Sequence, residues 1–513
     1  YIRHHIQFAA RSSLYQDISM SMRSLVTAIL ALSLASCAFY RKNPPLQHYD
    51  AAYGYRFSNL TPENPNQQSP NFIIVTLSGG GTRAAALAYG ALARMNQDQI
   101  GNGKTLLDEV DVISSVSGGS FASAYLGVFG KDRFINHFRD DVLYRQIQRD
   151  VIVRLFEPWN WPEWMLYGRS DIAESYYDSE IFAGNTYQSI PLRRPYIILN
   201  ATDLSWGARF EFTQEYFDRM CSDLSSVPIA RAVLASSAFP VAFTPITLKN
   251  YGAAPCGYRD PIWVREALQD FYGAPTRYDR ARAWISYENA TKRPYIHLSD
   301  GGLADNIGLR GPEVALTSGD SSWSLLPALN NRRLQRIAVI VVDAKGADDH
   351  SLDHRASRPN LSIVLNEAAT NPMENYSSDT IELLRQGFIE WEAAETDYET
   401  NVKQCKQLAA TTCSSTKESS DCESQRLKQC YDAFHANVPP PQPKLYRMHV
   451  RLDAESDPAK RKRLLEIPTS LELSKDNVEL LIQAGGELLA KSPAYSQLLA
   501  DLRANSRANA SHP

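Results

Sequence analysis

Two stretches of sequence, NFIIVTLSGGGTR at residues 71–83 and DVISSVSGGS at residues 111–120, decide the fold of this chain. In each stretch a short apolar run ends in a cluster of glycine and serine. A short apolar run is typical of a strand buried on both faces, and a glycine cluster after it marks a tight turn. Each stretch therefore predicts a β-strand, a turn and an α-helix in succession.

The same alternation continues through much of the chain. Further strand-like runs and helical patterns follow one another, and this order predicts an α/β fold with a mostly parallel central sheet covered by helices. The strand-like runs are 72–77, 110–114, 196–200, 295–298, 337–342 and 446–452, and the helical patterns are 83–96, 120–127, 133–154, 228–236 and 475–490.

The composition sets broad limits. With 513 residues, of which 44% are hydrophobic, the chain is long enough for one large core or two domains. The formal net charge of −4 gives no reason to expect a surface that binds polyanions. Nucleic acid is therefore not an expected partner.

The N-terminal region has the pattern of an export signal. Met20 or Met22 could be the true start. Arg23 and an apolar run at 25–35 follow, and Ser36 and Cys37 come directly after this run. A short apolar run with small residues at its end is typical of a secretion signal. The residues before Cys37, Leu-Ala-Ser, resemble a bacterial lipobox, which implies that Cys37 is lipidated; the alternative is an ordinary signal peptide with an accidental cysteine.

This signal predicts a place in the cell. We expect a lipid-anchored protein of the cell envelope, held in the membrane through Cys37. Ala38 follows in place of the Asp associated with inner-membrane retention, which favours the outer membrane, facing the periplasm. Residues 38–70 are rich in Pro, Asn, Gln and Tyr without a sustained period, so they are expected to form a tether from the lipid to the body.

The cysteines also fit an exported chain. Seven are present, and six remain without Cys37. Four of them are mirror-spaced between helix-prone segments at about 381–408 and 423–436, so an antiparallel helical hairpin would pair them and leave one further pair. No His lies among the four and CxxC is absent, so no metal site is expected. The predicted pairs are Cys405–Cys430, Cys413–Cys422 and Cys221–Cys256.

These features divide the chain into six parts. They are upstream residues and signal peptide (1–36), the tether (37–70), the core (71–346), a polar insertion with the helical cysteine hairpin (347–440), a C-terminal part of the core (441–504) and a tail (505–513).

Ser117 is the candidate nucleophile. It stands in Ser115-Val-Ser-Gly-Gly119, between a predicted strand and a predicted helix. Acyl transfer needs a serine on a strained turn of this kind, with small residues two positions before and after it, because strand and helix nearly touch there. The alternative is an ordinary connection in which a serine caps the helix.

The glycine loop at 78–83 is the candidate oxyanion hole. Gly79, Gly80 and Gly81 before a helix offer a concave row of backbone N–H groups. A phosphate loop is the alternative, but no Gly-Lys-Ser/Thr follows, and the spacing is not GxGxxG. Arg83 could bind the loop carbonyls or an anionic headgroup, or it could be a plain surface or loop-stabilising residue.

Asp300 is the candidate base. It ends the apolar strand at 295–300 and precedes Gly301 and Gly302. At the carboxyl end of a parallel strand it would face the same edge as Ser117, where open α/β sheets place their sites. A plain Asp-Gly-Gly turn is the alternative. His297 is the rival base, but on a regular strand it would point away from Asp300.

Five segments, in order, resemble the patatin-like phospholipase family over about residues 71–345, with a weaker echo at 441–500. The resemblance implies a three-layer α/β/α fold, a Ser117–Asp300 dyad that needs no His and no cofactor, and an oxyanion held by Gly79 to Gly81. Ser115 and Ala84 depart from the family pattern, which has Gly at both positions. The matching segments are 78–83, 115–119, 199–212, 230–240 and 300–302.

A run of aromatic residues at 157–167 holds three Trp and a Tyr. Such residues suit a membrane interface or the mouth of a lipid site, although a loop packed on the body is the more common outcome.

The resemblance implies a hydrolase of phospholipids or lysophospholipids. One alternative is a carboxylesterase or thioesterase that acts on smaller acyl esters with the same dyad. The other is a catalytically silent scaffold of the cell envelope, against which the intact serine, acid and glycine loop argue.

Overall fold

The computed structural model describes residues 40–61, 69–157, 168–240, 242–330, 333–347, 353–354, 356–413, 419–434 and 443–510. The predictions for the signal peptide, for Cys37 and for all but the first residue of the aromatic run at 157–167 lie outside these residues. None of the helices in the described ranges is long and apolar enough to cross a membrane.

An eight-stranded sheet forms the centre of the molecule, and its strand order is β10-β9-β1-β4-β5-β8-β7, with β6 paired to β5. The five strands from β10 to β5 run parallel, whereas β6 and β8 are antiparallel to β5. The predicted mostly parallel sheet is therefore confirmed. The strands are β1 (Asn71–Leu77), β4 (Val112–Val116), β5 (Tyr196–Asp203), β6 (Ala208–Glu211), β7 (Ile246–Lys249), β8 (Tyr295–Asp300), β9 (Arg336–Asp343) and β10 (Lys444–Arg451).

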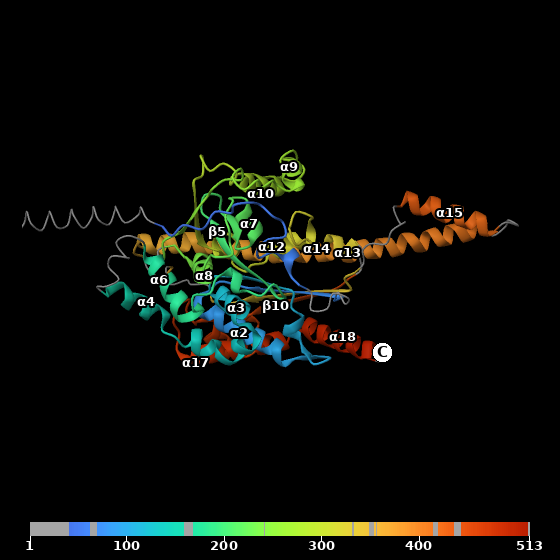
Figure 1. Cartoon of the computed structure of the whole chain (residues 1–513). Coiled ribbons are helices and arrows are strands. Elements are labelled where there is room, and N and C mark those ends of the chain that lie inside the picture. Colours follow the sequence, from blue (N-terminus) through green and yellow to red (C-terminus); the bar gives the residue numbers. More distant parts are fainter. Residues whose placement is uncertain are drawn as a thin grey trace, which may run out of the picture.

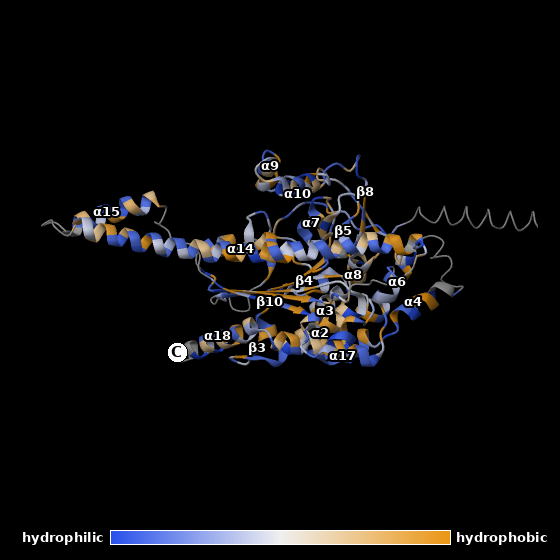
Figure 2. Cartoon of the chain, turned by 180° about the vertical axis from the view of Figure 1, so that it is seen from behind, coloured by the Kyte–Doolittle hydropathy of each residue, from blue (hydrophilic) through white to orange (hydrophobic). Residues whose placement is uncertain are grey.

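Helices cover both faces of this sheet (Figure 1). On one side lie α2 (Gly81–Gln97), α3 (Gly118–Phe138), α17 (Lys475–Ala490) and α18 (Pro493–Ala510). On the other lie α12 (Arg310–Thr317) and the long α14 (Leu361–Cys413). Every residue of β1, β4 and β5 is buried, and the strands form an apolar layer between the helices (Figure 2). This is the expected three-layer α/β/α arrangement.

The C-terminal part of the chain packs directly on the first helix. A side chain at Gly90 of α2 would place its Cβ 2.1 Å from the carbonyl oxygen of Ile482 in α17. Gly485 of α17 approaches α2 just as closely, with a Cβ 2.3 Å from the Leu87 carbonyl oxygen. Only glycine permits two helix backbones to come this near, so residues beyond 441 complete the core.

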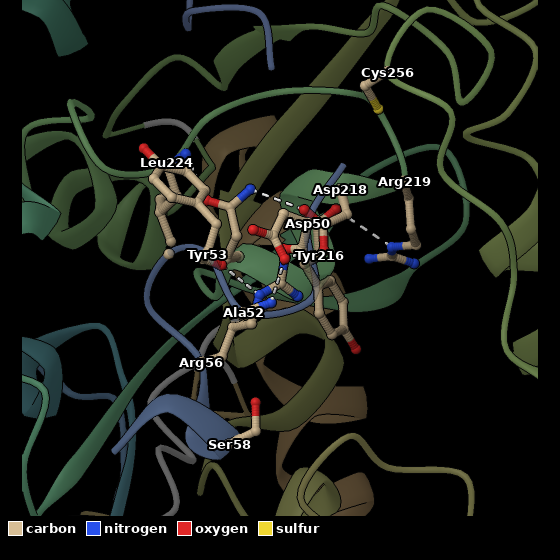
Figure 3. A network of polar contacts seen from close by, with 12 residues as sticks. Asp50, Ala52, Tyr53, Arg56, Ser58, Tyr216, Asp218, Arg219, Leu224 and Cys256 are labelled. Carbon is tan, nitrogen blue, oxygen red and sulfur yellow. Dashed lines mark hydrogen bonds and ion pairs between the residues drawn. The ribbon is translucent and has the colours of Figure 1, made fainter. Parts of the chain in front are cut away.

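Residues 40–61, which we call the N-terminal strap, are not a tether. Leu46 N–H donates to the Cys221 carbonyl at 2.7 Å, and the Asn43 amide nitrogen donates to Ser222 Oγ at 2.7 Å. Figure 3 shows Arg56 of the strap reaching Asp218, with which it forms a 2.6 Å ion pair. The tether prediction is wrong for these residues. Their polar and aromatic side chains show no periodicity, so nothing in the sequence indicated that they pack on the body.

The cysteine hairpin has the predicted pairing. Cys405 is joined to Cys430 and Cys413 to Cys422, with Cα–Cα distances of 5.6 and 5.9 Å. The pairs join α14 to α15 (Ser419–Ala433), and a third pair joins Cys221 to Cys256. The first helix of the hairpin begins at Leu361, about twenty residues before the predicted start, which brings it over the body.

Candidate active site

Ser117 lies on the turn between β4 and α3, with φ 50° and ψ −117°. This is strained for a residue with a side chain, and strain of this kind is concentrated at functional sites. The neighbouring glycines make the turn possible: a Cβ at Gly118 would lie 2.0 Å from the Gly81 carbonyl oxygen, and one at Gly119 would lie 2.8 Å from that of Leu77. The turn thus presses the serine against the glycine loop.

A chain of buried serine hydroxyls lies behind the nucleophile. The Ser117 N–H donates to Ser236 Oγ at 2.9 Å, and Ser236 Oγ also lies 2.9 Å from Ser120 Oγ. Ser115 Oγ in turn lies 3.2 Å from Ser120 Oγ and 2.6 Å from Ser123 Oγ. The family pattern has Gly at the position of Ser115. The fold accommodates the serine because its hydroxyl hydrogen-bonds to the hydroxyls of Ser120 and Ser123.

Sequence reasoning missed Ser120, Ser123 and Ser236 as parts of the site. Ser236 stands within the segment 230–240 that carried the family resemblance. Nothing in the sequence indicated that Ser236, on α8 (Ile229–Ser237), contacts Ser117, because the two residues are more than a hundred positions apart in the chain.

Asp300 is buried at the end of β8, with the Ser117 hydroxyl close enough to its carboxyl group to influence its pKa. The Gly302 N–H donates to Asp300 Oδ1 at 2.8 Å. Burial raises the pKa of Asp300 to about 6, against the lowering effects of the Gly302 N–H and the nearby Ser117 hydroxyl. A carboxyl with this pKa is ionised at neutral pH and remains basic enough to accept a proton from a serine.

The direction of β8 differs from the expectation. β8 is antiparallel to β5, with Asp300 opposite Ala201, while Val116 lies opposite Asn200 on the other side of β5. Asp300 thus reaches the level of Ser117 from the opposite direction, and the reasoning from the shared carboxyl edge of parallel strands was wrong.

The glycine loop borders Ser117 on its other side, because a Cβ at Gly79 would lie 3.3 Å from that of Ser117. The Gly79 N–H already donates to the Asn306 carbonyl at 2.8 Å, and the Thr82 N–H donates to the Ser470 carbonyl at 2.7 Å. Between them, Gly80 and Gly81 have positive φ values of 130° and 59°. Their N–H groups have no acceptor within the described part of the chain, so they are the donors open to a ligand.

Arg83 lies behind the loop. Its Nη1 donates to the Ile467 carbonyl at 2.7 Å, and its guanidinium packs beside Gly80 and Gly346. Burial lowers the pKa of this arginine, although Asp343 and Glu374 oppose the effect. The contacts are those of a loop-supporting residue that also borders the cavity described next.

These residues open into a cavity of about 650 Å³. Helix α14 forms part of its wall: a Cβ at Gly302 would lie 2.6 Å from Met373 Sδ, and Lys345 Nζ forms a 2.9 Å ion pair with Glu374. The expectation that the insertion lies outside the catalytic body is therefore wrong for the first half of α14. The α14 residues that line the cavity are Asn366, Thr370, Met373, Glu374, Ser377, Ser378 and Ile381.

His297 does not reach the cavity. Its side chain is exposed on β8, where Nδ1 lies 3.1 Å from Thr247 Oγ1 of β7. Asp300, three residues later, is buried, so the two point to different surroundings, as the alternation of a strand requires. The described residues contain no cluster of three or more His, Cys, Asp or Glu side chains suited to a metal ion.

Comparison with known proteins agrees with this geometry. Residues 75–312 match the family model described as patatin-like phospholipase. This segment is a patatin-like domain. It contains Ser117, Asp300 and the glycine loop, whereas β9, β10 and α17 complete the sheet and its cover from outside it.

One solved structure similar to the chain is human GIVD cytosolic phospholipase A2 in complex with methyl gamma-linolenyl fluorophosphonate, with 11% sequence identity and a TM-score of 0.34. The similarity covers 86% of this chain, which spans 60% of that protein. No curated protein matches the chain.

Proposed function

We propose that this chain is a lipid acyl hydrolase of the phospholipase A or lysophospholipase type. The observation that carries the proposal is the placement of Ser117, on a strained turn of a patatin-like domain, beside the buried carboxyl group of Asp300. The nucleophile and the base share one cavity, which also contains the open N–H groups of the glycine loop.

In the first half of the reaction, Ser117 Oγ attacks the acyl carbonyl carbon while Asp300 accepts the hydroxyl proton. The N–H groups of Gly80 and Gly81 hold the oxyanion, and they lie at the N-terminus of the 17-residue helix α2, whose dipole favours negative charge. The tetrahedral intermediate collapses to an acyl-enzyme, and Asp300 returns the proton to the departing alcohol oxygen.

In the second half, water replaces the alcohol. Asp300 accepts a proton from the water, whose oxygen attacks the acyl carbon, and Ser117 recovers its proton when the fatty acid leaves. Each step uses the same donors and the same base, so no imidazole is needed.

The cavity wall favours an acyl chain as the bound group. Apolar side chains from two helices and two loops line it, and its volume lies in the range of ordinary ligand sites. These side chains are Val151, Ile152, Phe239, Phe243, Met373, Ile381 and Leu471.

The place of action belongs to the same proposal. We infer that Cys37 carries the lipid anchor and that the protein resides in the cell envelope, at the outer membrane and facing the periplasm. The supporting observation is the sequence at 25–37, a short apolar run ending in Leu-Ala-Ser-Cys.

A hydrolysis panel tests the function. Diacyl phospholipids, lysophospholipids, short-chain esters and acyl thioesters are each offered to the wild type, to Ser117→Ala and to the exposed control Ser205→Ala. We expect release of fatty acid from the phospholipids or lysophospholipids by the wild type and the control, and none by Ser117→Ala.

Turnover of short esters or thioesters alone would assign the chain to the smaller-ester alternative. Absence of turnover, together with absence of serine labelling by a fluorophosphonate, would leave the scaffold alternative and contradict the proposal.

A further inference from the structure

The N-terminal strap fixes the place where the chain leaves the body. The Tyr40 ring lies 5.4 Å from that of Tyr295, and Arg41 Nη2 donates to Ser175 Oγ at 3.0 Å. Only Ala38 and Phe39 separate Tyr40 from Cys37. Three extended residues reach about 11 Å, so the proposed anchor on Cys37 would hold the lipid surface within about that distance of Tyr40.

Helix α6 (Arg169–Tyr177) connects this point to the mouth of the cavity. Its first residue, Arg169, lines the cavity, while Glu174 forms a 3.4 Å ion pair with Arg41. Five residues of helix span only about 8 Å, so the anchor point and the cavity lie at the same end of the molecule. In Figures 1 and 2, α6, α4 (Ile147–Phe156) and the beginning of α14 lie together at this end, away from α15.

This end carries exposed apolar side chains on two helices beside the cavity, which we call the mouth rim. On α4, Ile152 and Val153 are 47% and 49% exposed; on α14, Leu361, Val364 and Leu365 are 73%, 45% and 48% exposed. Ile152 itself and Asn366, the neighbour of Leu365, line the cavity. The rim therefore continues the apolar wall of the cavity to the surface.

We propose that the mouth rim docks on the lipid surface that holds the Cys37 anchor, so that an acyl chain passes from this surface into the cavity without crossing water. This inference deepens the proposed function and rests on the proposed anchor for its orientation. Apolar side chains exposed along one side of a helix allow a protein to lie on a lipid surface without spanning it. The short link after Cys37 leaves little freedom to present another face.

The test uses the full chain with Cys37→Ser, so that binding depends on the protein surface alone. Its probe is a vesicle of equal parts phosphatidylglycerol and phosphatidylethanolamine, with binding followed by co-sedimentation. Substituting Val153, Leu361 and Leu365 together by Ser should weaken binding at least about tenfold, because three apolar groups no longer enter the lipid. Substituting the same three positions by Phe should tighten it.

The matched control carries Ser at three other exposed apolar positions, Ile262, Phe271 and Tyr272, which are 66%, 49% and 95% exposed. These residues belong to the region of α9 (Ile262–Ala267) and α10 (Pro275–Ile285), which lies apart from α4 and α6 (Figure 1). We expect the control to bind vesicles as the parent does, and both triple variants to hydrolyse a monomeric substrate at the parental rate.

Equal binding by the rim variant and its parent, or a greater loss in the control, would overturn the docking proposal. Absence of hydrolysis in the parent would overturn the proposed function instead, since vesicle binding is measured without turnover.

Discussion

The hydroxyl of Ser236 joins the nucleophile to the central sheet: it accepts the N–H of Ser117 at 2.9 Å and donates to the Asn200 carbonyl at 2.6 Å. Ser236 is thus a positioning residue for the strained turn. In Ser236→Ala two buried backbone groups lose their partner, which should lower the unfolding free energy by about 2 kcal/mol. We expect kcat to fall roughly tenfold or more with little change in KM.

The matched control for Ser236→Ala is Ser123→Ala. Ser123 lies at the far end of the same hydroxyl network and bonds to Ser115 instead of the turn. It should lose a similar amount of stability and keep its kcat. Equal losses of kcat in the two variants would contradict a positioning role for Ser236.

The dyad predicts that its members fail as a unit. Ser117→Ala and Asp300→Asn should each lower kcat by roughly a thousandfold or more, and the double variant should be no worse than the single ones. Circular dichroism and thermal unfolding check that both remain folded. Near-normal hydrolysis by either purified variant, or losses that multiply, would contradict the assigned roles.

The pKa of Asp300 has two opposite consequences. Because burial raises this pKa to about 6, kcat/KM should rise with pH up to about 6 and then level off, and His297→Gln should show the same profile.

The same pKa affects stability. An unfolded Asp titrates near pH 4, so the folded state binds more protons between about pH 4 and 6, and the free energy of unfolding falls as the pH rises through this window. Asp300→Asn should therefore gain up to about 3 kcal/mol at pH 7, and the gain should disappear below about pH 4.

Chemical denaturation of wild type and Asp300→Asn at several pH values measures that gain. A stabilisation independent of pH would show that the carboxylate charge is not its cause. A deep loss of activity in His297→Gln would make this histidine the base.

The strap predicts a large effect of a residue far from the site. Arg56 and Asp218 are 4% and 1% exposed, so Arg56→Leu leaves a buried carboxylate without its cation and should cost about 3–5 kcal/mol of stability. Changing both residues to Leu should restore most of the loss, since the unpaired charge is gone. Equal stability of Arg56→Leu and wild type in urea unfolding would show that the strap is held by other contacts.

The cysteine hairpin should matter locally. Cys405 lies 24 residues beyond Ile381, the last α14 residue lining the cavity, which is about 36 Å along a helix. Replacing Cys405, Cys413, Cys422 and Cys430 by Ser should therefore speed proteolysis of α15 and the end of α14, while hydrolysis largely survives. Loss of hydrolysis together with faster proteolysis around Asn366 would show that the disulfides hold the cavity wall.

The sequence allowed the strands, the turn at Ser117, the glycine loop and the cysteine pairs to be predicted, because each depends on local periodicity or spacing. The strap escaped prediction because its order comes from contacts such as Asn43 with Ser222, far away in the chain. The direction of β8 and the contact of Met373 with Gly302 escaped prediction for the same reason, since both depend on segments far apart in the chain. Local patterns state what a segment can form, but not which distant segment it meets.

The strap also sets the order in which the chain can fold. Its partners, around Asp218, Cys221 and Cys256, follow it by more than 150 residues, and β1 lies between β4 and a strand that begins at Arg336. The strap residues must therefore wait for most of the chain that follows them before they find their places.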